Sequence, residues 1–201
     1  MNIPGMVLSM RTWSVCSALT LMSVSVAFGY QRNESSRLSI KHATDAAAAN
    51  IPTKAVHTTV EEMLSLSRPE GLAADISSQA YQTTRIEKFE TTRWVLEATI
   101  TEIVKRADGD FYMVIEGKSG AKTVVEAPDP ELCAGSHFLG EIKKVRKMLD
   151  DKFHPTAQPI KVNIKAQFTG VGFFGYQGRT PSGGRTNGAR LMPALDLKIS
   201  D

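Results

Sequence analysis

A strict alternation of apolar and polar positions starts at Trp94 and predicts a long β-strand there. The apolar positions recur at every second residue: Trp94, Leu96, Ala98 and Ile100. This is the period of a strand that turns one face toward a hydrophobic core. Glu102 then falls on the apolar phase while Ile103 falls off it, which predicts a bulge or bend in the strand. The patterned part of the chain therefore begins with a long, irregular strand.

Two shorter strands and a helix follow. We expect one strand at 111–116 and another at 123–126. The first is bounded by turn residues 107–110 and 117–120, and the second follows the later of these turns. Each turn contains the glycine expected in a hairpin. Ser136 is the expected N-cap of a helix that ends before Pro155. The apolar residues of this helix recur at helical spacing: Phe138, Ile142, Val145 and Leu149.

Two more strands complete the pattern. Residues 162–168 alternate cleanly, and after a glycine-rich loop the apolar residues of 191–199 share one face. Three strands, one helix and two strands is the element order of the OB-fold. We therefore expect a mainly β domain over residues 91–201, a five-stranded OB-like barrel with one helix between strands 3 and 4. The alternative is an open α+β sheet packed on the helix.

The pattern over residues 30–90 is much weaker. Its clearest signal is Thr58-Thr59-Val60-Glu61, a capping box that predicts the start of a short helix. We expect a weakly structured lead with this one docking helix, in preference to a second domain. Limited proteolysis should then leave a stable fragment that begins between residues 80 and 95.

The first 29 residues have the pattern of a secretory signal peptide. Arg11 is their single charged residue, an apolar run follows it, and small residues at Ser25 and Ala27 form a cleavage site. Cleavage after Ala27 or after Gly29 fits the pattern. The apolar run is shorter than the roughly 20 residues that a spanning helix needs. We therefore expect a periplasmic or secreted protein with no stable membrane anchor after cleavage.

Composition narrows the function classes. The chain has 201 residues, of which 42% are hydrophobic and 22% charged, and this excludes a wholly disordered protein. The formal net charge of +3 is too small to indicate nucleic-acid binding by itself. Signal cleavage removes Cys16 and leaves Cys133 alone, so the mature fold has no internal disulfide and depends on its core.

One pair of segments resembles secreted thermonucleases of the staphylococcal type. These are Asp108-Gly109-Asp110 and the Ala-Pro-Asp-Pro-Glu sequence of residues 127–131. The resemblance implies an OB-fold, acidic calcium ligands and arginines that hold a phosphate. However, the strand at 122–126 lacks the family's arginine, and Glu126 stands where that family has an aspartate. We therefore assign no catalytic residue and keep a thermonuclease-like phosphodiesterase as an alternative function.

The region from Trp94 onward resembles more closely a set of small exported bacterial OB-fold-like proteins of unassigned function. The resemblance covers roughly half of the chain and implies an exported OB-like domain without a known chemistry or cofactor. Its motifs, as they stand here, occupy residues 108–115, 125–128, Cys133, 153–155, 171–175, 187–188 and 191–196.

Two further motifs are rejected as sites. Gly117-Lys118-Ser119 imitates the end of a P-loop, but position 112 is a tyrosine instead of the required glycine. Cys133 and His137 have metal-ligand spacing, yet zinc needs three or four ligands, so we expect a buried structural thiol and no metal site.

The remaining candidate is the loop between the fourth and fifth strands, where aromatic residues precede arginines among glycines. OB-folds often bind oligonucleotides or oligosaccharides through this loop. We expect a binding module for an anionic polymer, an oligonucleotide or a glycan, in which the rings stack and the arginines hold anionic groups. The other hypotheses are a solvated hairpin with buried rings and a protein–protein adaptor for an envelope protein. The predicted ligand-binding residues are Phe173, Phe174, Tyr176, Arg179, Arg185 and Arg190.

Overall fold

The structure, a computed structural model, describes residues 37–72, 81–179 and 185–200. The predicted signal peptide of residues 1–29 lies outside the described residues. Within the described ranges, no helix is long and apolar enough to cross a membrane.

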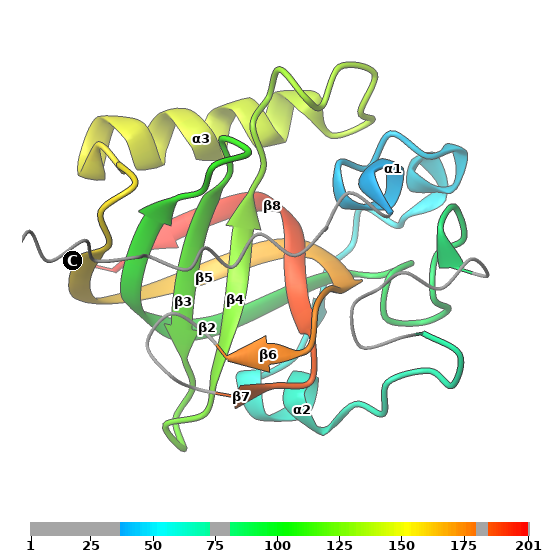
Figure 1. The fold of residues 1–201 in the computed structure, drawn as a ribbon, viewed down its shortest axis with the longest axis horizontal. Coiled ribbons are helices and arrows are strands. Elements are labelled where there is room, and N and C mark those ends of the chain that lie inside the picture. Colours follow the sequence, from blue (N-terminus) through cyan, green and yellow to red (C-terminus); the bar gives the residue numbers. More distant parts are fainter. Residues whose placement is uncertain (1–36, 73–80, 180–184, 201) are drawn as a thin grey trace, which may run out of the picture. The chain divides into compact units, whose positions relative to one another are not determined.

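The fold is mainly β, as predicted, and is built on a six-stranded mixed sheet (Figure 1). The strands pair in the order β1-β2-β3-β4-β8-β5, and β2 also pairs with β5, so a ring of hydrogen bonds runs through the sheet. The helix α3 (Leu139–Phe153) lies between β4 and β5 in sequence, which confirms the predicted order of three strands, a helix and two strands. The strands are β1 (Val56–His57), β2 (Arg93–Lys105), β3 (Phe111–Glu116), β4 (Lys122–Ala127), β5 (Ile160–Phe174) and β8 (Ala189–Ile199).

The predicted irregularity in the first long strand is confirmed. The register of β2 shifts between Ile100 and Glu102 against both β3 and β5. A bulge adds one residue to one strand and so reverses the faces beyond it. Ile100 and Ile103 can therefore both enter the core, where both are fully buried, while Glu102 leaves the apolar phase and pairs with Lys161 of β5.

In the described structure the helices α2 and α3 contribute to the main core, and they lie at opposite ends of the sheet (Figure 1). The helix α3 contacts β4 and β8 and buries Val145 and Leu149 in the main hydrophobic cluster. The short helix α2 (Val60–Ser65) also contacts β4 and β8 and adds Val60 and Met63 to the same cluster. A segment before β2 thus supplies part of the main core.

The capping box of α2 begins one residue later than the sequence pattern indicates. Thr59, not Thr58, is the N-cap, and its side chain accepts a hydrogen bond from the Glu62 N–H. The Glu62 carboxylate in turn accepts from the Thr59 N–H at 2.9 Å. Either threonine has an acidic residue three positions later, so the local sequence cannot distinguish the two frames. At α3 the predicted Ser136 cap is also wrong, because Phe138 is the N-cap and no side chain caps it.

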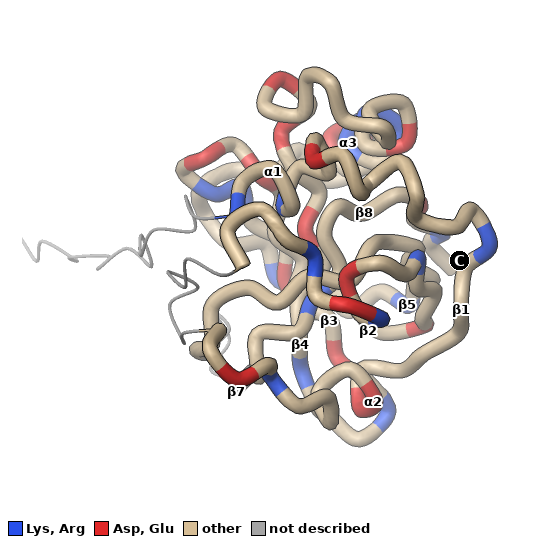
Figure 2. Tube along the Cα trace, turned by 90° about the vertical axis from the view of Figure 1, so that its right-hand side faces the viewer, with Lys and Arg blue, Asp and Glu red and all other residues tan. Residues whose placement is uncertain are grey.

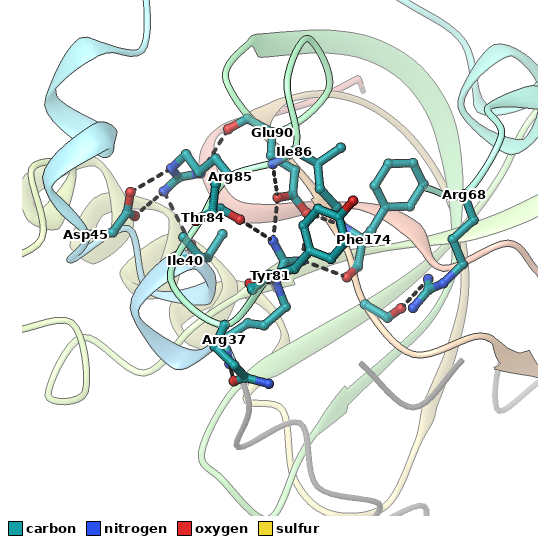
Figure 3. A network of polar contacts seen from close by, with 12 residues as sticks. Arg37, Ile40, Asp45, Arg68, Tyr81, Thr84, Arg85, Ile86, Glu90 and Phe174 are labelled. Carbon is teal, nitrogen blue, oxygen red and sulfur yellow. Dashed lines mark hydrogen bonds and ion pairs between the residues drawn. The ribbon is translucent and has the colours of Figure 1, made fainter. Parts of the chain in front are cut away.

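The segment 37–72 is more extensively packed than a lead with one helix. It also contains α1 (Leu38–Lys41) and the 3-10 helix η1 (Ala46–Asn50). Arg37 forms a fully buried, bidentate ion pair with Glu90, with Nη2 to Oε2 at 2.5 Å and Nη1 to Oε1 at 2.9 Å (Figure 3). The remaining donors reach backbone carbonyls of Tyr81, Thr84 and Phe174. Burying a charge is costly unless it is paired and hydrogen-bonded, and this pair meets both conditions.

A second arginine extends the same network (Figure 3). Arg85 donates to both carboxylate oxygens of Asp45, at 3.0 and 2.6 Å, and to the carbonyls of Glu90 and Ile40. The segment that carries α1 and η1 is therefore tied to the loop before β2 by two arginine–carboxylate pairs.

Candidate functional site

The connection between β5 and β8, which the sequence predicts as the ligand loop, forms a small hairpin of its own. The strands β6 (Gly178–Arg179) and β7 (Arg185–Thr186) pair antiparallel, and Arg179 is the register partner of Arg185. β7 also contacts β4 of the main sheet. The side chains of these two arginines lie outside the described part of the structure.

The two phenylalanines at the base of this connection are buried. Phe173 is 1% exposed and packs with Ile40 and Met192, while the Arg37 guanidinium lies 5.0 Å from its ring centroid. Phe174 is 2% exposed and its ring lies 4.8 Å from that of Phe89. Ligand stacking requires exposed rings, so neither phenylalanine can act as the sequence-based hypothesis proposes. Their role is to anchor β5 to the core.

Arg190, the third predicted arginine, is also buried and already paired. Its Nη1 donates to the Glu126 carboxylate of β4, and its Nη2 donates to the Tyr176 carbonyl at 3.1 Å. A Cβ at Gly175 would lie 2.6 Å from the Arg190 Cζ, so the missing side chain of Gly175 makes room for the guanidinium. Tyr176 is half-buried beside this pair. Arg190 therefore has its charge balanced within the protein.

Two residues that sequence reasoning missed fix the base of the hairpin. Arg68 donates to the Gly175 carbonyl at 2.8 Å and to the Leu72 carbonyl at 3.2 Å. The Asn187 amide donates to carbonyls at the C-terminal end of α2, those of Met63 and Leu64 within the helix and that of the C-cap residue Leu66 at 3.0 Å. No local signal identifies these contacts, because Asn187 lies 121 residues from Leu66 and Arg68 lies 107 residues from Gly175.

The thermonuclease-like turn contains an internal cation. The Lys41 ammonium lies 2.9 Å from Asp108 Oδ2 and 2.7 Å from Asp110 Oδ2, and its side chain is 2% exposed. Burial raises the pKa of both carboxyls and Lys41 lowers it, with a net downward shift for Asp108 and a net upward shift for Asp110. A lysine thus stands between the two carboxylates that the resemblance would assign to calcium, and sequence reasoning missed it 67 residues away.

The same turn is held by an arginine from α3. Arg146 donates to the carbonyls of Gly109 and Ala127, at 3.0 and 3.1 Å, and its Cζ lies 3.3 Å from the Phe111 ring centroid. Burial lowers the pKa of this guanidinium. An arginine committed to two carbonyls and a ring face organises the loops, whereas a phosphate-binding arginine needs donors directed to the ligand.

The residues with metal-ligand spacing do not converge. Cys133 is fully buried, and burial, together with the nearby Asp110 and Asp129 charges, raises the pKa of its thiol to about 12. A metal binds the thiolate, which this environment disfavours. His137 and His154 are exposed at opposite ends of α3. Across the described residues, no group of three or more His, Cys, Asp or Glu side chains could hold a metal ion.

No protein family matches the chain, and no curated protein sequence matches it. Functional assignment therefore rests on the sequence and on the geometry given above. Figure 2 shows basic and acidic residues interspersed along the chain, in keeping with the formal net charge of +3. A charged ligand would have to recognise a local feature, and one such feature is the β6–β7 hairpin, whose register places Arg179 opposite Arg185.

Proposed function

We propose that this protein is an exported binding module, an OB-like barrel that holds an anionic polymer at the β6–β7 hairpin. The export signal is the pattern of residues 1–29. The OB-like assignment is supported by the ring of pairings through β2, β3, β4, β8 and β5, with α3 between β4 and β5. No cofactor is part of the proposal.

The observation that carries the proposal is the register of Arg179 with Arg185. Directly opposed residues of an antiparallel pair are close neighbours, and like charges in such positions are destabilising. An anion bound by both residues would offset that repulsion, and guanidinium groups match phosphate, sulfate and carboxylate geometry. Arg190 is a positioning residue in this proposal, since Glu126 already balances its charge.

The burial of the two phenylalanines changes the expected ligand chemistry. With Phe173 and Phe174 in the core, base stacking contributes little, and recognition depends on charge. The ligand class is a polyanion, either a single-stranded oligonucleotide or an acidic glycan. Binding should therefore weaken steeply as salt rises and show little base preference.

The test compares two variants with the same change in charge. Arg179→Ala/Arg185→Ala removes the register pair, and Lys143→Ala/Lys152→Ala removes two exposed lysines of α3 as the matched control. Labelled oligo-dT and an acidic polysaccharide are titrated against each protein at low salt. We expect the arginine variant to bind at least about tenfold more weakly than the wild type. The slope of its log binding constant against log salt concentration should be smaller in magnitude by roughly one to two, and the affinity of the control variant should stay within about twofold of the wild type.

The two ligand arms separate the sources of the anion. Binding of the polysaccharide but not oligo-dT assigns the site to glycans, and the reverse assigns it to nucleic acid. Equal weakening of both variants would mean that total charge governs binding, and the hairpin proposal would then be wrong. Absence of binding to either polymer would leave a solvated hairpin as the role of this loop.

A further inference from the structure

The buried pair of Lys41 with Asp110 differs from the other buried ion pairs of the described structure, because its cation is a lysine. The pair of Arg37 with Glu90, for example, uses a guanidinium group, which stays protonated in proteins. A buried lysine can instead lose its proton and act as a nucleophile. In each of the other lysine–carboxylate pairs between described residues, at least a quarter of the lysine side chain is exposed, against 2% for Lys41.

The Lys41 nitrogen lies against the Asp110 carboxyl without hydrogen bonding to it. Nζ is 2.7 Å from Oδ2 of Asp110, yet this oxygen accepts no hydrogen bond in the described structure. Nζ donates instead to Asp108 Oδ2 at 2.9 Å. The second oxygen of Asp110, Oδ1, accepts a hydrogen bond from the Asp129 N–H at 2.8 Å. The amine is thus in contact with one carboxyl while it uses the other as its acceptor.

The two carboxyls have environments that suit different roles. The Asp110 side chain is fully buried, and burial outweighs the Lys41 charge and raises its pKa, which favours the neutral acid. The Asp108 side chain is 44% exposed, and although burial opposes its ionisation, Lys41 and the hydrogen bond from the Asp110 N–H lower its pKa. Neighbouring carboxyls whose pKa values are shifted apart are the usual arrangement of an acid and a base.

We propose that Lys41 and Asp110 become joined by an amide bond between Nζ and Cγ, which the protein forms itself with the loss of one water. Asp108 takes a proton from the ammonium, and the lone pair of the resulting amine attacks Cγ of Asp110. The electron pair of the C=O bond moves onto Oδ1, where the Asp129 N–H stabilises it. When that pair re-forms the C=O bond, Oδ2 leaves as water with its own proton and the proton held by Asp108. Asp108 then takes the second proton from the nitrogen and releases it to solvent. No atom changes its oxidation state, so neither an oxidant nor a reductant is needed.

Two properties of the site favour this bond. An amide is neutral, so its formation ends the desolvation cost of two buried charges. The reactants are also held in contact, and well-oriented intramolecular reactions reach effective molarities of about 10⁵–10⁸ M. The product would fasten α1 to the turn before β3 in a protein whose buried Cys133 forms no disulfide. This inference does not depend on the ligand proposed for the β6–β7 hairpin.

The first test is the mass of the wild-type protein. The purified protein is denatured, and its intact mass is compared with the mass calculated for the chain with its observed N-terminus. We expect a mass about 18 Da lower, the loss of one water. Trypsin does not cleave after an acylated lysine, so its digest should contain residues 38–54 joined to residues 107–118. Without the bond, trypsin releases 38–41, 42–54 and 107–118 as separate peptides.

Four variants assign the reacting atoms. Lys41→Arg has no amine and should have its full calculated mass, whereas Lys147→Arg changes the exposed Lys147–Asp151 pair and should keep the loss, as the matched control. Asp110→Asn has ammonia as its leaving group, so we expect a loss of about 17 Da and the same joined peptide. Asp108→Asn lacks the base and should contain at least about tenfold less of the joined peptide at the same age.

The wild-type measurement alone can overturn the proposal. A full calculated mass without the joined peptide would show that Lys41 and Asp110 remain an ion pair. A loss of about 18 Da that is confined to peptide 107–118 would also overturn it, because a cyclic imide at Asp108-Gly109 loses one water as well. A joined peptide that persists in Lys41→Arg would place the bond on another residue and would likewise contradict the assignment.

Discussion

At the scale of single residues, buried charges in this protein occur as pairs that join distant parts of the chain. Arg37 meets Glu90, Lys41 meets Asp110, and the third pair is Arg190 with Glu126. Burying an ion pair gains little net stability compared with a well-packed apolar pair, but removing one partner is strongly destabilising. These pairs therefore act mainly by fixing which segments pack together.

The pair between Arg37 and Glu90 gives the clearest prediction at this scale. Arg37→Ala leaves the Glu90 carboxylate buried without its cation, and we expect the free energy of unfolding to fall by about 3–5 kcal/mol in urea denaturation. Lys143→Ala, at an exposed position of α3, should change it by no more than about 0.5 kcal/mol. A loss for Arg37→Ala no larger than that for Lys143→Ala would contradict the argument.

His42 predicts how stability depends on pH. Burial and the adjacent Lys41 charge lower the pKa of its imidazole from 6.5 to about 4. Between these pH values the unfolded chain binds a proton that the folded chain does not, so the free energy of unfolding falls as pH decreases through this window. His42→Gln should reduce that slope, measured as the difference between wild type and variant in urea titrations from pH 7 to 4. Parallel curves for the two proteins would exclude this role of His42.

At the scale of elements, close backbone approaches show where the loop before β2 lies. A Cβ at Gly172 of β5 would collide with the carbonyl oxygen of Phe89 and lie 2.9 Å from the Cδ2 atom of the Phe89 ring. A Cβ at Gly140 of α3 would instead meet nothing within 4 Å. We expect Gly172→Ala to destabilise the fold by about 1–3 kcal/mol and Gly140→Ala to stabilise it by about 0.5–1 kcal/mol. Thermal denaturation of both variants measures whether each substitution lowers or raises stability. An unchanged stability of Gly172→Ala would show that the loop before β2 does not pack closely against Gly172.

The element pattern was readable from the sequence wherever one face of a strand or helix is buried. The strands from Trp94 onward, the helix before His154 and the bulge at Glu102 all follow from the spacing of apolar residues. The helix caps were misplaced by one or two residues, because several neighbouring side chains satisfy the same local rule. The packing of 37–72 was not readable, since its contacts depend on partners 40 or more residues away.

The candidate site was predictable only in part for the same reason. The sequence locates the loop between β5 and β8, but burial of Phe174 depends on its contact with Phe89, and the state of Arg190 depends on Glu126 of another strand. A row of aromatic and basic residues looks the same whether it faces a ligand or the core.

At the scale of the whole molecule, the packing of 37–72 reverses the expectation for a shortened chain. The helix α2 adds Val60 and Met63 to the main core, and both are essentially unexposed. Removing the residues before 91 would take away α2 and so open apolar surface at one end of the sheet. It would also delete Lys41, the buried partner of Asp110. The hydrophobic and electrostatic contributions therefore both predict that residues 91–201 do not form a stable unit alone.

The experiment compares the chain shortened to residues 91–201 with residues 31–201. We expect cooperative thermal unfolding and a dispersed amide NMR spectrum only for the longer chain, and we expect limited proteolysis of that chain to yield a resistant core that still contains residues 37–65. A cooperative transition of the shorter chain within a few degrees of the longer one would show that the sheet needs neither α2 nor the Arg37 network. The contacts of 37–72 would then be a docked lead on an independent domain, as the sequence pattern predicts.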